Sequence, residues 1–274
     1  MTSSDSSPLR VGIGGLGAIG LAVARKLDAG IPGLALAAVS ARDTAKAPRN
    51  LSGFAAVPPV VPLAELAGLA DIVVECAPAA VFTEVAKPAI RAGRIFVPAS
   101  VGALLSHPDL IDLAEETGAR IIVPTGALLG LDAVRAAAEG TIRSVTMKTR
   151  KPPAGLAGAP HLIENGIDLT GLTEPLKVFE GTAREGAKGF PANVNVAAAL
   201  GLAGVGPDKT RLQIWADPGV TRNTHTIEVD ADSARFTMTI EGIPSDENPR
   251  TGRLTPLSVI TALRGLVSSL KVGS

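Results

Sequence analysis

Apolar residues recur with two different periods along the first 125 residues, and the two periods alternate. Leu9, Val11 and Ile13 alternate with other residues as in a short buried strand, and residues 18–27 follow with a helical pattern. The same reading predicts further strands at 34–39, 57–61, 70–77, 94–97 and 120–123, and helices at 80–92 and 108–117. Regular alternation of strands and helices is typical of a doubly wound parallel sheet with right-handed crossovers.

The pattern changes near Gly126. Strands with period-two patterning become frequent and helices become rare, which suggests an antiparallel meander in a second, α+β domain that could cover a nucleotide site. Helices are expected at 129–139 and 190–203, strands at 144–150, 211–216, 224–229 and 234–241, a Pro/Gly/Ala-rich loop at 151–160, and a last apolar helix at 256–270. We therefore predict one domain at 1–127, with the C-terminal helix (about 253–274) packed back on it, and a second domain at 128–252.

A glycine fingerprint lies between the first strand and the first helix. Gly15, Gly17 and Gly20 have the G-x-G-x-x-G spacing, which permits a tight turn, close approach of a pyrophosphate, and close packing of helix on sheet. The first helix residues, Ala18 and Ile19, present free N–H groups and the positive end of the helix dipole to the phosphates. A second strand at βαβ distance strengthens the motif, so we predict an α/β, Rossmann-type domain that binds a dinucleotide.

Composition narrows the classes of function. The chain has 274 residues, 46% hydrophobic and only 3% aromatic, as expected for a sheet buried on both faces by aliphatic side chains. Equal numbers of basic and acidic residues, 26 each, give no field that attracts nucleic acid or an anionic membrane. One cysteine excludes an intramolecular disulfide and a cysteine-rich metal site. Without a signal peptide or an apolar run long enough to span a bilayer, a cytoplasmic protein is expected.

The identity of the dinucleotide depends on the end of the second strand, where an acidic residue usually binds the ribose 2′-hydroxyl. Here Ser40 and Arg42 occupy that region, and Asp43 lies further along the chain than the expected acidic residue. A hydroxyl and a guanidinium suit a 2′-phosphate, so NADP is as plausible as NAD, although Arg42 also fits a solvated surface position. Ala77 and Pro78 form the small-residue loop on the nicotinamide side, and Cys76 is better explained as a packing residue than as a nucleophile.

Hydride transfer from an alcohol or amine also needs a proton acceptor. His107 fits a helix start or the surface, and His161 lies at the end of the Pro/Gly loop, where histidines are more often solvated. His225 heads a strand among polar residues, yet taken alone it is no more than a candidate. Asn193 and Asn195 open an apolar helix, where amides are natural caps, although Asn193 could also reach the nicotinamide.

Five segments together resemble L-aspartate dehydrogenase, in order and over nearly the whole chain: 15–20, 126–132, 148–153, 191–196 and 223–225. The resemblance implies an NAD(P)-binding domain joined to an α+β domain, in a homodimer, and oxidation of L-aspartate to iminosuccinate, which can feed NAD synthesis or hydrolyse to oxaloacetate and ammonia. It implies that His225 is the active-site histidine and that Ala127 and Asn193 contact the cofactor. Asp43 lies beyond the position where an acidic residue would bind the ribose, so the choice between NAD and NADP stays open.

The mechanism implied has a neutral His225 taking a proton from the substrate amine. The two substrate carboxylates need cationic or N–H partners, for which the candidates are Lys148, Arg150, Lys151 and Asn195. For any single one of the three cations, a solvated position on an edge strand is an equally good interpretation. Three other functions compete: an imine reductase on a related small diacid, a dihydrodipicolinate-reductase-like enzyme, for which no paired-histidine segment is found, and a nucleotide-sensing module without catalysis.

Overall fold

The structure, a computed structural model, describes residues 7–191, 194–245, 247 and 251–273, and contacts between residues divide the chain into two compact units. The first unit contains the residues up to Ser100, together with His107–Pro124 and Pro256–Lys271. The second contains Val101–Ser106, Thr125–Thr255 and the residues from Val272 on. The segment Val101–Ser106 was not expected in the second unit. The predicted limits at 127 and 252 stay predictions.

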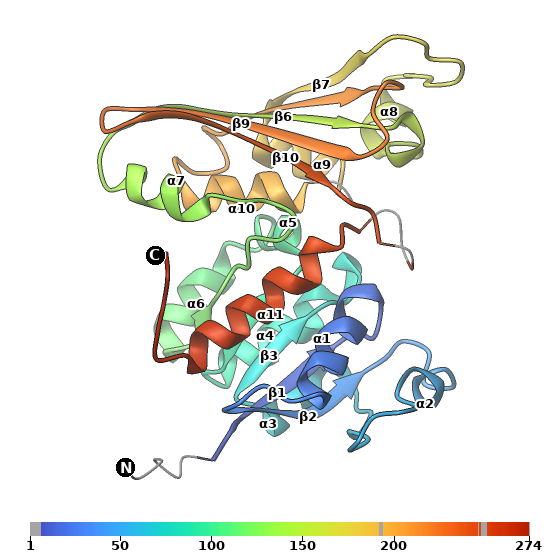
Figure 1. The fold of residues 1–274 in the computed structure, drawn as a ribbon, viewed down its shortest axis with the longest axis vertical. Coiled ribbons are helices and arrows are strands. Elements are labelled where there is room, and N and C mark those ends of the chain that lie inside the picture. The colour runs from blue at the N-terminus through green and yellow to red at the C-terminus, as the bar shows by residue number, and fades with distance from the viewer. Residues whose placement is uncertain (1–6, 192–193, 246, 248–250, 274) are drawn as a thin grey trace. The chain divides into compact units, whose positions relative to one another are not determined.

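The first unit is built on five parallel strands in the order β2-β1-β3-β4-β5. They are β1 (Leu9–Gly14), β2 (Leu34–Ser40), β3 (Ile72–Glu75), β4 (Ile95–Pro98) and β5 (Arg120–Ile121). The four residues of β3 are all buried, as expected for a strand covered on both faces. The doubly wound parallel sheet expected from the sequence is therefore present (Figure 1).

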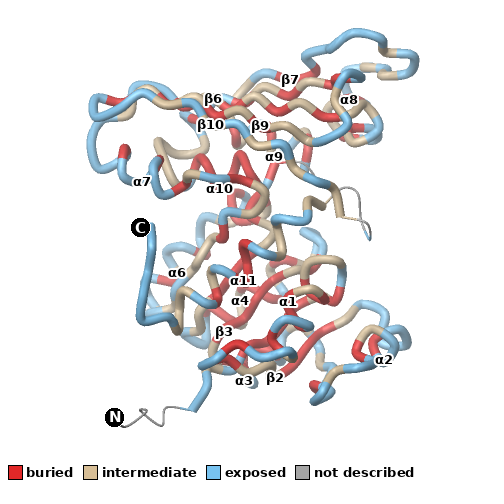
Figure 2. The backbone as a smooth tube through the Cα atoms, viewed as in Figure 1, coloured by how far each residue is buried: buried red, intermediate tan, exposed pale blue. Residues whose placement is uncertain are grey.

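Helices cover both faces of this sheet. Val11 and Ile13 pack in one core cluster with α1 (Ala18–Asp28) and α11 (Leu254–Val267). The alternate positions, Gly12 and Gly14, face α3 (Leu66–Leu69) and α4 (Phe82–Arg91), and α6 (Asp109–Thr117) packs on α4. Figure 2 shows the buried positions concentrated in β3 and in the flanking helices. Short helices complete the unit: α2 (Ala47–Asn50), η1 (Leu63–Glu65) and η2 (Ala79–Val81).

The strand predicted at 57–61 is wrong. Only Val60 forms a bridge, with Val39 at the edge of the sheet. Pro58, Pro59 and Pro62 lack the N–H that a ladder needs, so the segment cannot extend the sheet beyond this single bridge.

The second unit has a mixed five-stranded sheet in the order β10-β9-β6-β8-β7. Its strands are β6 (Ile142–Lys151), β7 (Leu176–Thr182), β8 (Arg211–Ala216), β9 (Asn223–Ala231) and β10 (Arg235–Gly242). Three pairs are antiparallel, whereas β6 and β8 are parallel, so the predicted meander is corrected to a mixed topology. The longest strand, β6, lies at the centre of the sheet.

Helices of this unit pack against one face of the sheet (Figure 1). They include α7 (Leu131–Ala138), α9 (Ala183–Gly189) and α10 (Asn195–Ala203), the last beginning five residues later than predicted. Val145, Met147, Leu212 and Ile214 are buried at alternate positions of β6 and β8, as the period of a strand requires. The sequence reading missed β7, α9, α8 (Pro160–Glu164) and the turn η3 (Pro153–Gly155).

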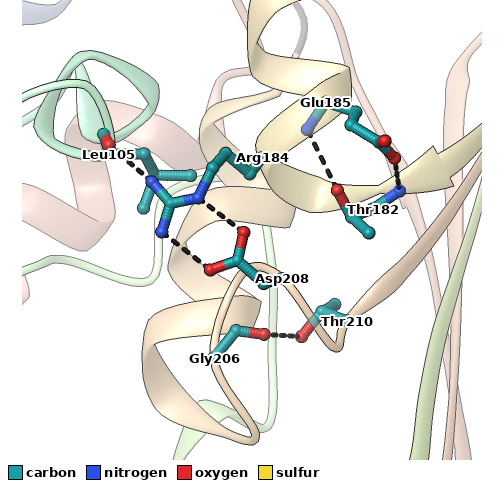
Figure 3. Close-up of polar contacts among 7 residues, drawn as sticks. All are labelled: Leu105, Thr182, Arg184, Glu185, Gly206, Asp208 and Thr210. Atoms are coloured by element: carbon teal, nitrogen blue, oxygen red, sulfur yellow. Dashed lines mark hydrogen bonds and ion pairs between the residues drawn. The ribbon is translucent and has the colours of Figure 1, made fainter.

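Polar contacts at the start of α9 hold the segment 101–106, which contains α5 (Val101–Leu104), within the second unit (Figure 3). Thr182 and Glu185 form a capping box that satisfies the first N–H groups of α9. Arg184 then donates two hydrogen bonds to Asp208 and a third, 2.8 Å long, to the carbonyl oxygen of Leu105. A guanidinium that joins a carboxylate to a backbone carbonyl fixes both segments at once.

Candidate functional site

The glycine loop has the geometry that a pyrophosphate needs. Gly15 has a φ of +109°, and a Cβ there would lie 2.6 Å from the carbonyl oxygen of Cys76. A Cβ on Gly20 would lie 1.8 Å from the carbonyl oxygen of Gly15, so helix α1 can pack this close only on a glycine. Gly17, the N-cap of α1, faces open space. Its neighbours Ala18 and Ile19 begin the helix and add free N–H groups.

The ribose region follows β2. Ser40 is buried at the end of the strand, and its carbonyl oxygen accepts a hydrogen bond from the N–H of Gly15. Arg42 is exposed. Asp43 forms an ion pair of 3.2 Å with Lys46, which lowers the pKa of its carboxyl group through the hydrogen bond from Lys46. Asp43 thus already stabilises the turn that follows, and Arg42 is the exposed cation next to it.

Other predicted cofactor residues lie in two loops. Ala77 is buried and Pro78 exposed directly after β3, beside the glycine loop. Ala127 is half-buried in the loop before α7, in the second unit. Asn193 lies outside the described residues.

His225 is buried in β9, and its ring contacts the neighbouring strand. Thr149 of β6 lies directly opposite in the antiparallel register, and its Oγ1 is 3.1 Å from Nδ1 of His225. The two side chains are 2% and 4% exposed, respectively. Burial lowers the pKa of His225 to about 3, with a further contribution from the charge of Lys151. The imidazole is therefore neutral over the ordinary pH range.

Lys151 shares this environment. It is buried at the end of β6, two residues beyond Thr149 and so on the same face of the strand. Burial lowers the pKa of Lys151 to about 8, so the ammonium form still predominates at neutral pH. A buried histidine and a buried lysine in one electrostatic environment are typical of a functional site rather than of a packed core.

Lys148 and Arg150 lie on the opposite face of β6. Lys148 pairs with Glu228 at 2.7 Å, and Arg150 pairs with Asp217 at 2.8 Å while lying over the ring of Trp215. Of the three predicted cations, only Lys151 therefore shares a face with His225. Oδ1 of Asn195 accepts a hydrogen bond from the N–H of Gly102 at 2.9 Å. The sequence analysis missed Thr149. It lies two residues before Lys151, so the alternation of a strand places both side chains on the same face.

The remaining candidates serve packing. His107 stacks on Phe82, and His161, expected in a solvated loop, packs between Phe179 and Phe190. Burial raises the pKa of the Cys76 thiol, with a further effect of Glu75, which disfavours the nucleophilic thiolate. Within the described residues no group of three or more His, Cys, Asp or Glu side chains is arranged to hold a metal ion. Nor does that part of the chain contain a helix with the length and hydropathy to cross a membrane.

Comparisons with known proteins give relatives that match nearly the whole chain. The chain is 60% identical over 269 residues to the L-aspartate dehydrogenase of Bradyrhizobium diazoefficiens, covering 98% of this chain and 95% of that one. It is 54% identical to L-aspartate dehydrogenase 3 of Bordetella bronchiseptica, over 99% of this chain and 100% of that one. The chain belongs to the L-aspartate dehydrogenase family. It is an NAD(P)-dependent amino-acid dehydrogenase, which accounts for the dinucleotide fold of its first unit.

Family models match both units. The homoserine dehydrogenase NAD-binding domain matches residues 15–124, and the C-terminal domain of aspartate dehydrogenase matches 132–266. Among solved structures, aspartate dehydrogenase from Thermotoga maritima is similar with a TM-score of 0.70 and 26% identity, over 97% of this chain and 99% of that one. The fold class predicted from the sequence and the membership of the family are thus confirmed, and the first unit is an NAD(P)-binding domain.

Proposed function

We propose that this protein oxidises L-aspartate to iminosuccinate with NAD(P)⁺ and that His225 exchanges the proton. The observation that carries the proposal is the buried group of His225, Thr149 and Lys151 in a chain 60% identical to an L-aspartate dehydrogenase. Iminosuccinate then hydrolyses to oxaloacetate and ammonia. The same residues serve the reverse reaction, in which the imidazolium returns the proton to the nascent amine.

The chain's own residues fit the dinucleotide. The open position at Gly17 and the N–H groups of Ala18 and Ile19 suit a pyrophosphate, and Ser40 and Arg42 suit the adenosine ribose with or without its 2′-phosphate. Ala77, Pro78, Ala127 and Asn193 are proposed to contact the nicotinamide end. When bound, NAD(P)⁺ supplies the acceptor for the hydride that leaves Cα of the substrate.

The proton step belongs to His225. Aspartate reaches the site as an ammonium, and a neutral imidazole can take one of its protons. If Nδ1–H donates to Oγ1 of Thr149, then Nε2 carries the free lone pair and is the base. The ring is neutral because burial lowers the pKa of His225. Carboxylates of bound aspartate beside the ring would raise that pKa toward a value suited to proton exchange.

Lys151 is the proposed partner for a substrate carboxylate. A buried ammonium next to a buried imidazole is stabilised when an anion binds between them, and the anion favours the charged form of Lys151. Lys148 and Arg150 lie on the face of β6 opposite to His225, so neither is assigned this role. The amide nitrogen of Asn195 remains a weaker candidate.

The test is the formation of NAD(P)H from a panel of L-amino acids by the wild type and by His225→Ala. We expect activity with L-aspartate and a loss of turnover of roughly 10²–10⁴-fold in the variant. His107→Ala, a histidine replacement in the other unit, is the matched control and should retain the wild-type rate. Normal turnover by a folded His225→Ala would contradict the assigned role, and no activity with any amino acid would favour a nucleotide-sensing module.

The homodimer expected from the family resemblance stays a prediction. Light scattering of the purified chain gives its molar mass directly, and a mass near twice 27.7 kDa is the expected result. A mass of one chain at micromolar concentration would contradict it.

A further inference from the structure

A buried carboxyl group lies at the end of β3 in the NAD(P)-binding unit. Glu75 follows three aliphatic residues in a strand covered on both faces, and its side chain is fully buried. Glutamate almost never takes such a position unless hydrogen bonds compensate its lost hydration. The glycine fingerprint does not include this residue, and the proposed reaction does not use it.

Three donors converge on the two carboxyl oxygens of Glu75. The N–H of Ala77 donates to Oε1 at 2.9 Å, the N–H of Ser100 to Oε2 at 2.9 Å, and the hydroxyl of Ser100 lies 3.0 Å from Oε1. The backbone adds another link, since the N–H of Ala99 donates to the carbonyl oxygen of Glu75 at 2.8 Å. Ala77 follows β3, and Ser100 follows β4. One carboxyl group therefore ties together the loops at the carboxyl ends of two neighbouring strands.

The loop that Glu75 holds packs against the glycine loop. A Cβ on Gly15 would lie 2.6 Å from the carbonyl oxygen of Cys76 and 3.1 Å from Cα of Ala77. The N–H of Cys76 also donates to the carbonyl oxygen of Gly14 at 2.8 Å. A displacement of residues 76–77 by a few tenths of an ångström would therefore move the loop that is built to receive the pyrophosphate.

These loops flank the point where the strand order reverses. β1 has β2 on one side and β3 on the other, and in open α/β sheets ligands bind outside the carboxyl ends of the strands at such a point. Glu75 is the last residue of β3, and its carboxyl group contacts the loop that follows this strand. Its position relates it to the cofactor rather than to the packing of the strand.

Stability alone does not explain a glutamate here. Burial raises the pKa of Glu75 to about 7 against the lowering effect of the hydrogen bonds from Ser100 and Ala77, so burial is the dominant influence on this group. An aliphatic residue would continue the pattern of Ile72, Val73 and Val74 without that cost. Residues that break a local pattern at a ligand site are commonly retained for function.

We propose that Glu75 is a positioning residue for NAD(P), which holds the loops 76–78 and 99–100 in the conformation that the glycine loop requires. The proposal rests on dinucleotide binding by the first unit and not on the oxidation of aspartate. It can therefore be tested without an amino-acid substrate, and its failure is distinct from a failure of the proposed reaction.

The test is the dissociation constant of NADH and of NADPH in Glu75→Gln, titrated through the fluorescence of the reduced nicotinamide. Glutamine preserves size but turns an NH₂ group toward one of the backbone donors, so either Ala77 or Ser100 loses its acceptor. An unsatisfied buried donor should raise both dissociation constants roughly tenfold. Glu84→Gln makes the same chemical change at an exposed position of α4 and should leave them unchanged.

A second readout separates positioning from folding. Hydrogen exchange of the peptide containing residues 76–100 should be faster in Glu75→Gln without cofactor, while the remaining peptides of the unit exchange as in the wild type. Ser100→Ala removes one donor and keeps both backbone bonds, so it should raise the dissociation constants by a smaller factor, about threefold. Wild-type affinity in folded Glu75→Gln overturns the proposal, and if that variant does not fold, wild-type affinity in Ser100→Ala overturns it.

Discussion

Thr149 and His225 face each other across the β6–β9 pair, with Oγ1 of the threonine 3.1 Å from Nδ1 of the histidine. Because a neutral imidazole carries one proton, this contact decides which nitrogen is free. A donor Nδ1–H leaves Nε2 as the base, whereas an acceptor Nδ1 leaves Nε2 protonated and unable to take a proton. The catalytic role proposed for His225 thus requires the first arrangement.

Replacement of Thr149 by valine tests this dependence. Valine has nearly the same shape but no hydroxyl, so the ring loses the partner that fixes its tautomer. We expect kcat to fall roughly tenfold, the equivalent of one hydrogen bond, with KM for the cofactor unchanged. Steady-state kinetics at saturating aspartate provides the measurement.

Thr226→Val is the matched control for that experiment. Thr226 is the next residue in β9, but its side chain contacts Thr239 of β10 instead of the histidine. It should retain the wild-type kcat. Equal losses in the two variants would show that the effect comes from the sheet and not from the tautomer of His225.

The substrate-binding role of Lys151 leads to a second prediction. Lys151→Met preserves the length of the side chain and removes its charge, so an aspartate carboxylate would lose its cationic partner. KM for L-aspartate should rise roughly 30-fold or more, because loss of one partner of a buried charge pair costs about 2–5 kcal/mol. Lys148→Met, which removes the exposed pair with Glu228, should change KM little. The opposite ranking would move the substrate to the other face of β6.

Cofactor choice provides a third prediction. Arg42 is exposed beside the buried Ser40, whereas Asp43 is engaged with Lys46. If Arg42 contacts a 2′-phosphate, Arg42→Ala should raise KM for NADP⁺ roughly tenfold and leave KM for NAD⁺ unchanged. An unaltered value for NADP⁺ would remove Arg42 from cofactor recognition.

The first unit was largely predictable because its signals are local. Apolar strands, amphipathic helices and the glycine spacing each depend on a few adjacent residues, and most of its strands and longer helices lie within a few residues of their expected limits. The failure at 57–61 shows the limit of that reading. The β-branched valines favour a strand, but Pro58 and Pro59 cannot donate to a ladder, and one bridge remains.

The second unit was less predictable because its sheet joins distant segments. Nothing local indicates that β6 pairs in parallel with β8, some sixty residues later, or that 176–182 forms an edge strand beyond it. One part of the candidate site follows from the sequence pattern, and another part does not. The sequence analysis kept Lys148, Arg150 and Lys151 as equal candidates, although the alternation along β6, with Val145 and Met147 on the buried face, places only Lys151 on that face. The buried contact of Thr149 with His225 depends on the β6–β9 register, which only the fold provides.

The buried imidazole also predicts how stability depends on pH. The folded protein keeps His225 neutral down to a pKa of about 3, against an ordinary value of 6.5, because burial opposes its charged form. Below about pH 6.5 the unfolded chain therefore binds a proton on this ring that the folded chain does not. The free energy of unfolding should decrease as the pH falls, by up to about 1.4 kcal/mol per pH unit from this group.

Urea unfolding of the wild type and of His225→Gln between pH 7 and pH 4.5 isolates the contribution of this ring to the free energy of unfolding. The wild type should lose stability relative to the variant as the pH falls, and a constant difference would mean that His225 titrates normally and lies in contact with water.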